Sequence, residues 1–314
     1  MLLNKVVSDQ ADGLRCLMAQ HAGGQAARVV ALIGSGPGVG VTSVIMNLAA
    51  ALVQQGQEVL LLDEHGGDPS SAAAALCAIG VKGAAPAGNW SQVATGALSL
   101  SDAAGRVSSG ALLLPAFKGD ATLTTIRSRF QGQVVLIDAR RDERGALSPL
   151  AAQADDVVVV FRPQATSITA AYACIKQLHY VHALQQLRVM LNLAAGALEA
   201  RRVLDNLAAA GSRYLGLALE SAGCVAADAQ LPHAQRMRLS VVEAFQTSAA
   251  AVDFRRIAGQ LLQWPRKTPD QDLRKVAMAR RIDEDSTHGR PGDATQSGRL
   301  CVSPADVICE MSAK

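Results

Sequence analysis

Aromatic side chains and excess charge of one sign are both scarce in this sequence of 314 residues. Phe, Trp and Tyr make up 3% of the chain while apolar residues make up 49%. We therefore expect a core of Ala, Val and Leu, as helices packed on a parallel sheet need. The formal net charge of +3 is too small an excess to predict nucleic-acid binding by itself.

Paired cysteines and long apolar runs are also missing. The sequence has no CxxC pair and no His near a cysteine at metal-ligand spacing, which argues against a zinc site and a disulfide framework. Residues 1–7 lack the apolar core of a signal peptide, and no later apolar run reaches the roughly 18 residues of a membrane span. We therefore expect a cytoplasmic protein with six reduced thiols, on Cys16, Cys77, Cys174, Cys224, Cys301 and Cys309.

Short apolar strands alternate with longer helical segments from Arg28 onward. Apolar runs such as VVLI and VVVVF, without alternation, are typical of strands buried on both faces of a parallel sheet. The pattern predicts an α/β fold with a doubly wound, mostly parallel sheet flanked by helices. The predicted strands are Val29–Ile33, Val59–Leu62, Val134–Ile137, Val157–Phe161 and Val189–Leu191, and the predicted helices are Thr42–Gln54, Ser167–Leu178 and Leu198–Ala209.

Two further segments flank this body, which we assign to residues 28–264. Residues 1–27 contain a short amphipathic helix, predicted over residues 8–21, and a linker. Residues 265–314 are polar, mixed in charge and rich in turn formers, with too little apolar content to offset the entropy of ordering. We expect this tail to be disordered or loosely helical.

A strand, a glycine-rich turn and a helix follow one another in residues 28–56. In this context the phosphate-binding loop GxxxxGK[ST] binds phosphate through its lysine and through a nest of backbone N–H groups. Here Val41 takes the lysine position, Ser35 takes the first glycine position, and Pro37 removes one N–H. A nucleotide cradle and the hydroxyl that would face Mg²⁺ are retained in Gly38, Val39, Gly40, Thr42 and Ser43.

The missing lysine lowers the expected affinity for nucleotide. A charge-assisted contact contributes on the order of 1.5–3 kcal/mol, which corresponds to a loss of roughly ten- to a hundred-fold in affinity. Two interpretations stay open: weak binding of ATP or ADP with Mg²⁺, and a plain strand-to-helix connection in which the glycines serve packing.

The text of this loop, GSGPGVGVT, resembles the deviant phosphate loop of the MinD/ParA ATPases, SGKGGVGKT. The resemblance covers about residues 8–264. It continues through VLLLDEHGGDPS, VVLIDARRDERG and LAAQADDVVVVFRPQATSITAAYACIK, where it implies a turn at Pro163 and a Thr166–Ser167 helix cap. It ends in SRYLGLALE and AVDFRRIAGQLL, which resemble a last strand and a closing helix.

Within that family, the opening DQADGLR resembles the DQAxxLR motif of the flagellar number regulators of the FlhG/FleN branch. In that branch the short helix binds and stimulates the GTPase FlhF. The resemblance implies this role for Asp9, Gln10, Leu14 and Arg15, together with flagellar basal-body or transcriptional regulators as further partners. It also implies a place at the cell pole or at the inner membrane surface through those partners, with at most peripheral membrane contact.

Several positions depart from the family's catalytic pattern. The first loop lysine, which reaches across a dimer, is Gly36 here, and His65 stands where the family has the carboxylate that orients water. The second switch keeps Asp138 but continues with Arg140 and Arg141 where small residues form the γ-phosphate sensor. Catalysis of phosphoryl transfer is mostly positioning and charge stabilisation. We therefore expect no catalytic residue. For both arginines a solvated surface position is favoured over the alternative, in which they supply positive charge to a phosphate from a new direction.

The same resemblance implies the remaining site residues. Thr42, Asp63 and Asp138 are the candidates for Mg²⁺, and Asn192, which closes a predicted strand, matches a position that can face adenine. A strand-end cap explains Asn192 nearly as well.

The leading hypothesis is a regulator of flagellar number or placement that stimulates an FlhF-type GTPase and whose body is a pseudo-ATPase. One alternative is a nucleotide-dependent dimerising switch with a rearranged but working site. A second alternative is a ParA-like DNA-positioning protein, which would show steeply salt-dependent DNA binding.

Overall fold

The computed structural model describes residues 26–65, 86–116, 122–130 and 133–265. The predicted helix over residues 8–21, with its four partner-binding candidates, lies outside the described residues, as does the tail after Pro265.

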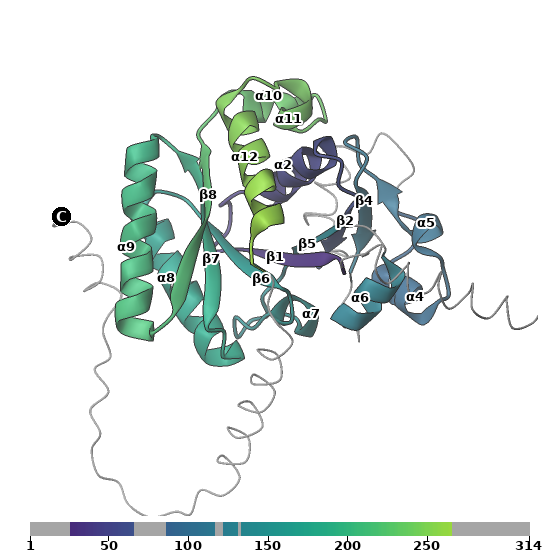
Figure 1. The fold of residues 1–314 in the computed structure, drawn as a ribbon, viewed down its shortest axis with the longest axis horizontal. Helices are drawn as coiled ribbons and strands as arrows, with labels where there is room; N and C mark the ends of the chain where they lie inside the picture. Colours follow the sequence, from purple (N-terminus) through teal and green to yellow (C-terminus); the bar gives the residue numbers. More distant parts are fainter. Residues whose placement is uncertain (1–25, 66–85, 117–121, 131–132, 266–314) are drawn as a thin grey trace, which may run out of the picture.

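Within the described residues the strands form one sheet in the order β3-β4-β2-β5-β1-β6-β7-β8 (Figure 1). Only the β3–β4 pair is antiparallel among the pairs of these strands. The strands are β1 Arg28–Gly34, β2 Val59–Asp63, β3 Gly105–Arg106, β4 Leu112–Pro115, β5 Val134–Asp138, β6 Asp156–Phe161, β7 Gln186–Ala194 and β8 Ala218–Ala226. The predicted doubly wound, mostly parallel sheet is confirmed.

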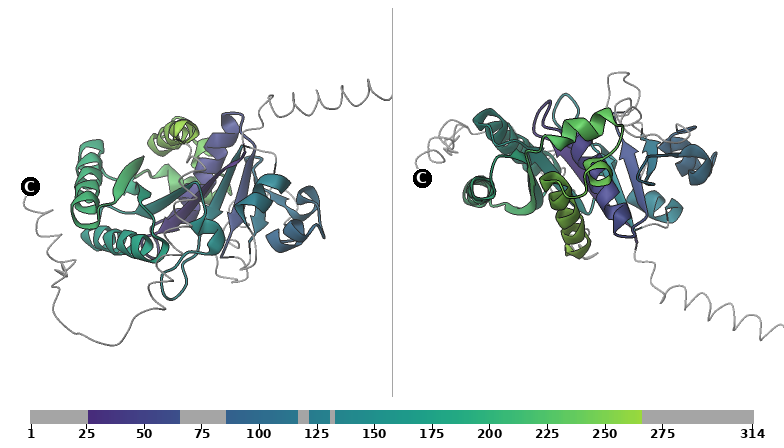
Figure 2. Two further views of the ribbon diagram at one scale, coloured as in Figure 1. Left: turned by 60° about the horizontal axis from the view of Figure 1, so that its bottom comes forward. Right: turned by 90° about the horizontal axis from the view of Figure 1, so that it is seen from above.

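Helices cover both faces of this sheet, as the views in Figure 2 show. They are α2 Val41–Gln54, α4 Trp90–Thr95, α5 Leu100–Ala103, α6 Leu123–Arg129, α7 Pro149–Ala152, α8 Ala165–His182, α9 Ala197–Leu215, α10 Gln230–Arg236, α11 Val241–Ala244 and α12 Ala249–Gln263. The five predicted strands and three predicted helices are all present. Most of their ends agree within a few residues, but α8 and α9 run four and six residues beyond their predicted C-terminal ends. The last strand and closing helix that the resemblance implied are β8 and α12.

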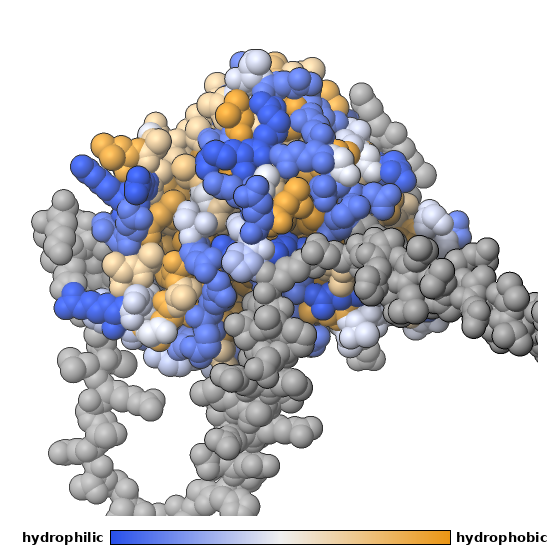
Figure 3. Space-filling model, in the orientation of Figure 1, coloured by the Kyte–Doolittle hydropathy of each residue, from blue (hydrophilic) through white to orange (hydrophobic). Residues whose placement is uncertain are grey.

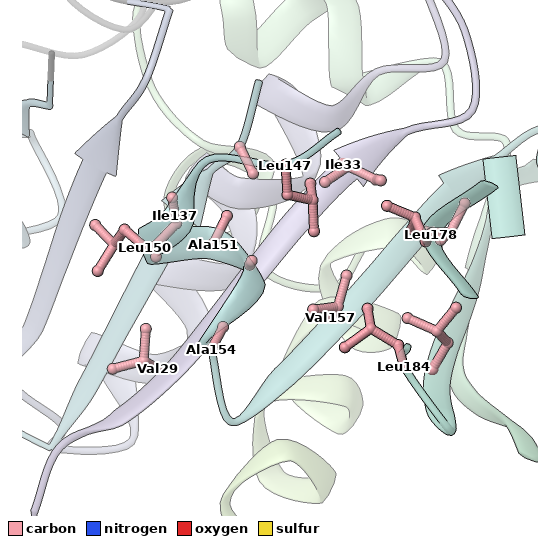
Figure 4. Close-up of a cluster of buried hydrophobic side chains, with 14 of the residues drawn as sticks. Val29, Ile33, Ile137, Leu147, Leu150, Ala151, Ala154, Val157, Leu178 and Leu184 are labelled. Atoms are coloured by element: carbon pink, nitrogen blue, oxygen red, sulfur yellow. The ribbon is translucent and has the colours of Figure 1, made fainter. Parts of the chain in front are cut away.

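The core divides into two apolar clusters, one on each face of the sheet. Along β1, Val29 and Ile33 join one cluster, whereas Val30 and Leu32 join the other, because side chains alternate along a strand. Figure 4 shows part of the first cluster, where Val29 and Ile33 pack with residues of β5, α7, β6 and α8. The second cluster packs under α2, α11 and α12. Burial on both faces explains why the strand sequences are apolar without alternation.

The position of β1 determines where a ligand can bind. β1 lies between β5 and β6 and is parallel to both. The chain winds outward on both sides of β1, and the carboxyl ends of strands at such a reversal point form the usual ligand crevice. The glycine-rich turn follows β1 at this edge of the sheet.

The N-terminus of α8 differs from the expectation. The helix has Gln164 as its N-cap, without a side-chain cap hydrogen bond, so the predicted Thr166–Ser167 cap is wrong. Ser167 Oγ instead accepts the backbone N–H of Arg162 at 2.9 Å. The hydroxyl therefore holds the turn that precedes the helix, which contains Pro163.

The remaining features of the described residues concern cysteines, surface hydropathy and helix length. The two cysteines in the described segments, Cys174 and Cys224, are not in disulfides. On the face shown in Figure 3, hydrophilic side chains are interspersed with apolar ones. In the described segments no helix has both the length and the apolar character required to cross a membrane.

Candidate nucleotide site

The turn between β1 and α2 keeps the backbone shape that its glycines permit. Gly38 and Gly40 have φ angles of 71° and 91°, in the left-handed region that disfavours side chains. A Cβ atom on Gly40 would lie 2.6 Å from Asn192 Nδ2, so glycine is required there for space as well. Gly40 is the N-cap of α2, and its carbonyl accepts the N–H of Val44.

The lysine position is occupied by a packed apolar side chain. A Cβ atom at Gly34 would lie 3.0 Å from Val39 Cγ2 and 3.1 Å from Val41 Cγ2, so both valines pack against the end of β1. Val41 also contacts the cluster beneath α2. The position that would carry a cation to the phosphates therefore supplies only methyl groups.

Asn192 fixes the end of the same turn. Its buried side-chain Nδ2 donates to the carbonyl of Val39 at 2.9 Å, and its Oδ1 accepts the N–H of Leu193 at 3.0 Å. β7 continues to Ala194, so the expectation that Asn192 closes the strand is wrong. In this conformation the amide nitrogen is bonded to the turn itself.

Two carboxylates meet at the ends of β2 and β5. Asp63 and Asp138 are paired in the register of these strands, and both are buried. Thr42 Oγ1 donates to Asp138 Oδ2 at 3.2 Å, and His65 Nε2 lies 3.6 Å from Asp138 Oδ1. Burial, and then the charge of Asp63, raise the pKa of Asp138 to about 7.

The chemistry of this group fits a magnesium ion. Asp63 Oδ2 is buried and has no hydrogen-bond partner, and Asp138 and the Thr42 hydroxyl supply further oxygen atoms, the ligand type that Mg²⁺ prefers. The described segments contain no cluster of three His, Cys, Asp or Glu side chains able to hold a metal. Water or phosphate oxygens would therefore have to complete the coordination shell.

The two arginines after β5 occupy different environments. Arg140 is exposed, as expected. Arg141 is half-buried, and its Nη2 donates to the carbonyls of Gly34 and Ser35 at 3.2 and 3.4 Å. The expected solvated position is wrong for Arg141, because the chain after β5 turns back toward the phosphate loop.

Sequence reasoning also missed a role for Glu64. Its Oε1 accepts from Ser148 Oγ, and its Oε2 accepts the N–H of Arg140 at 3.0 Å. Burial raises the pKa of Glu64 above its usual value. The position of Glu64 directly after strand β2, beside Asp63, indicated that it lies near the site. Its partners could not be predicted, because they lie more than 70 positions away in the sequence.

A cavity of about 880 Å³ lies over the phosphate loop. Its charged lining consists of Arg140 and Arg141 against Asp138, Asp142 and Glu143, so cations do not outnumber carboxyl groups. Such a lining is poorly suited to several phosphate charges. The predicted site residues that line it are Gly36, Gly38, Val39, Gly40, Val41, Thr42, Ser43, His65 and Asp138.

Asp63 and Asn192 do not line the cavity but contact residues that do. Asp63 is paired with Asp138 in the sheet, and Asn192 bonds to the carbonyl of Val39. Ser43 also has a partner, because its Oγ accepts from Gln235 Nε2 at 2.8 Å. The structure thus brings together every predicted nucleotide-site residue and adds Glu64 and Arg141.

Known proteins resemble this chain in sequence and in fold, although no protein-family model matches it. The antiactivator FleN of Pseudomonas aeruginosa is 28% identical over 252 residues, which cover 76% of this chain and 87% of FleN. The MinD cell division protein of Aquifex aeolicus has a TM-score of 0.60 at 20% identity, covering 77% of this chain and all of that one. MinD of Pyrococcus horikoshii in complex with Mg-ADP has a TM-score of 0.54 at 17% identity, covering 75% of this chain and 96% of that one.

The solved structures establish the fold, and FleN supplies the likeness in sequence. Both agree with the resemblance found in the loop and switch segments. The chain has the fold of the MinD/ParA-type P-loop proteins, and its sequence is similar to that of the antiactivator FleN.

Proposed function

We propose that this protein regulates the number or placement of flagella by binding protein partners, and that its MinD-like body is a pseudo-ATPase. Residues 9–15 would bind and stimulate an FlhF-type GTPase. The body would present further surfaces to flagellar basal-body or transcriptional regulator proteins, which would bring the protein to the cell pole or the membrane surface.

The observation that carries the proposal is the side chain at the lysine position. Val41 packs on the end of β1, and Gly36 leaves the second lysine position without a cation. Neither Arg140 nor Arg141 gives the cavity a cationic excess, because Asp142 and Glu143 line it beside them. Since phosphoryl transfer depends on charge stabilisation, hydrolysis is not expected. The similarity to FleN supports the flagellar role.

ATP turnover by the purified full-length chain tests the first part. We expect no turnover above that of the Thr42→Ala variant, which lacks the hydroxyl next to Asp138 and so reports any contaminating ATPase. Turnover by the wild type that disappears in Thr42→Ala would contradict the pseudo-ATPase assignment.

Stimulation of GTP hydrolysis tests the second part. The chain is mixed with an FlhF-type GTPase, and GTP turnover is measured with the wild type, Gln10→Ala and Gln20→Ala. We expect stimulation by the wild type and by Gln20→Ala, whose substituted residue lies outside the motif, and loss of stimulation with Gln10→Ala. Absence of both binding and stimulation with the wild type would remove this assignment.

The retained glycines and carboxylates favour a second function, a nucleotide-dependent dimerising switch. Titration with Mg-ATP, combined with light scattering, separates the two. Tight binding with a change from monomer to dimer would support the switch, whereas weak or absent binding and an unchanged mass would support the pseudo-ATPase.

A further inference from the structure

The chain after β5 folds into a compact turn of its own, residues 140–148, which we call the latch segment. Arg141 and Leu147 form an antiparallel bridge. Asp142 Oδ1 accepts the N–H groups of Arg144 and Ala146 at 2.9 and 2.8 Å. Gly145, with φ of 78°, donates its N–H back to the carbonyl of Asp142. These hydrogen bonds within the latch segment hold residues 142–146 in a tight turn.

Helix α8 holds the latch segment from one side. The N–H of Leu147 donates to His182 Nε2 at 2.9 Å, and Gln177 Nε2 donates to the carbonyl of Arg144. Burial lowers the pKa of His182, which keeps the ring neutral and able to accept this bond. Leu147 packs beside Ile33, as Figure 4 shows, so the segment is also anchored in the core.

The end of β2 and the phosphate loop hold the latch segment from two further sides. Glu64 accepts from Ser148 Oγ and from the N–H of Arg140. Arg141 donates to the carbonyls of Gly34 and Ser35. All these bonds join side chains and backbone groups of this chain.

We propose that Arg141 and Glu64 fix the latch segment in a single conformation, so that the body has the same structure with and without nucleotide. This inference rests on the pseudo-ATPase assignment and adds a reason for it. A ligand shifts a conformational equilibrium only by its differential affinity for two states. Any second conformation of the segment would have to break the hydrogen bonds that hold it on three sides, which works against its selection by nucleotide.

Hydrogen exchange of the latch-segment amides in the full-length chain tests the proposal. We expect slow exchange in the wild type and no change when Mg-ATP is added. Arg141→Ala should accelerate exchange in this segment on the order of tenfold or more. Arg140→Ala is the matched control, because it removes the same charge from the same cavity, while Arg140 bonds Glu64 through its backbone N–H only.

Glu64→Gln gives a second variant in case Arg141→Ala fails to fold. The glutamine side chain has one carbonyl oxygen and so cannot accept both bonds of Glu64. It should also accelerate exchange in the latch segment, while exchange in β1 and β7 stays unchanged. Fast exchange in the wild type, or equal exchange in Arg141→Ala and Arg140→Ala, would overturn the proposal.

ATP turnover measured on the same samples separates the two claims. Turnover by the wild type would contradict the pseudo-ATPase assignment itself. A wild type that shows no ATP turnover but fast exchange in the latch segment would contradict only the proposal that this segment has a single conformation.

Discussion

At the scale of single residues, the pair Asp63 and Asp138 sets the electrostatics of the site. Both carboxylates end parallel neighbouring strands and are buried, so strand register forces two like charges together. Val41, at the position where the phosphate-loop pattern has lysine, supplies no charge to offset them. Raised pKa values for Asp63 and Asp138 are the physical consequence, with burial as the main cause in each case.

This pair predicts a stability effect that depends on pH. The pKa of Asp138 is about 7 in the folded chain against 3.8 for an ordinary aspartate. Its contribution to stability is therefore fully present below about pH 4 and is lost as the pH rises through 7. The neutral variant Asp138→Asn should be more stable than the wild type near pH 8, on the order of 2–4 kcal/mol, and not at low pH.

Thermal unfolding in a metal-free buffer across this pH range provides the measurement. Asp205→Asn is the control, because Asp205 is exposed and pairs with Arg201 on the same helix. An Asp138→Asn variant whose stability follows pH as the wild type does would show that Asp138 is ionised at neutral pH.

At the scale of elements, α2 is joined to α11 through one buried side chain. Asn47 Nδ2 donates to the carbonyl of Ser43 and Oδ1 accepts the N–H of Val241, each at 2.7 Å. Asn47 therefore satisfies the otherwise buried N–H at the start of α11. This contact also orients α2, whose N-terminus carries the residues of the nucleotide site.

Asn47→Ala should therefore lower the free energy of unfolding by about 1–3 kcal/mol, because the N–H of Val241 loses its partner in a buried position. Gln54→Ala is the matched control: Gln54 donates from an exposed position to the carbonyl of Val242. Urea denaturation followed by circular dichroism measures both variants. Equal effects for the two would mean that burial of the bond at Asn47 has no energetic consequence.

At the scale of the whole molecule, a buried ion cluster joins elements from both ends of the described chain. Asp156 Oδ2 accepts from Arg28 and Oδ1 from Arg188, each at 2.8 Å, and all three side chains are at least nine-tenths buried. The Arg188 guanidinium lies 4.0 Å from the centre of the Trp264 ring, and Arg28 donates to the carbonyl of Trp264. β1, β6, β7 and the residue after α12 are thereby held at one place.

Asp156→Asn should be strongly destabilising, by about 3–5 kcal/mol, because it leaves two buried guanidinium groups without their shared carboxylate. Glu220→Gln, which alters a more exposed partner of Arg188, should cost about 1 kcal/mol or less. Urea denaturation distinguishes the two. A small effect of Asp156→Asn would mean that the arginines find other partners or reach water.

The sequence by itself determined the sheet, the glycine-rich turn and the missing cation. Apolar runs without alternation predict doubly covered parallel strands, and the carboxyl ends of such strands gather Thr42, Asp63 and Asp138 at one edge of the sheet. Short elements such as β3 and α5 escaped prediction, since two to four residues carry too little periodicity.

Only the tertiary structure decided how the site is held. The contacts of Arg141 with Gly34, of Glu64 with Ser148 and of Asn192 with Val39 join residues 84 to 153 positions apart. Local pattern carries no information on such distant partners, because they depend on how strands order in the sheet and how the chain turns after β5. Arg141, for which the sequence predicted a solvated position, therefore donates hydrogen bonds to the start of the phosphate loop.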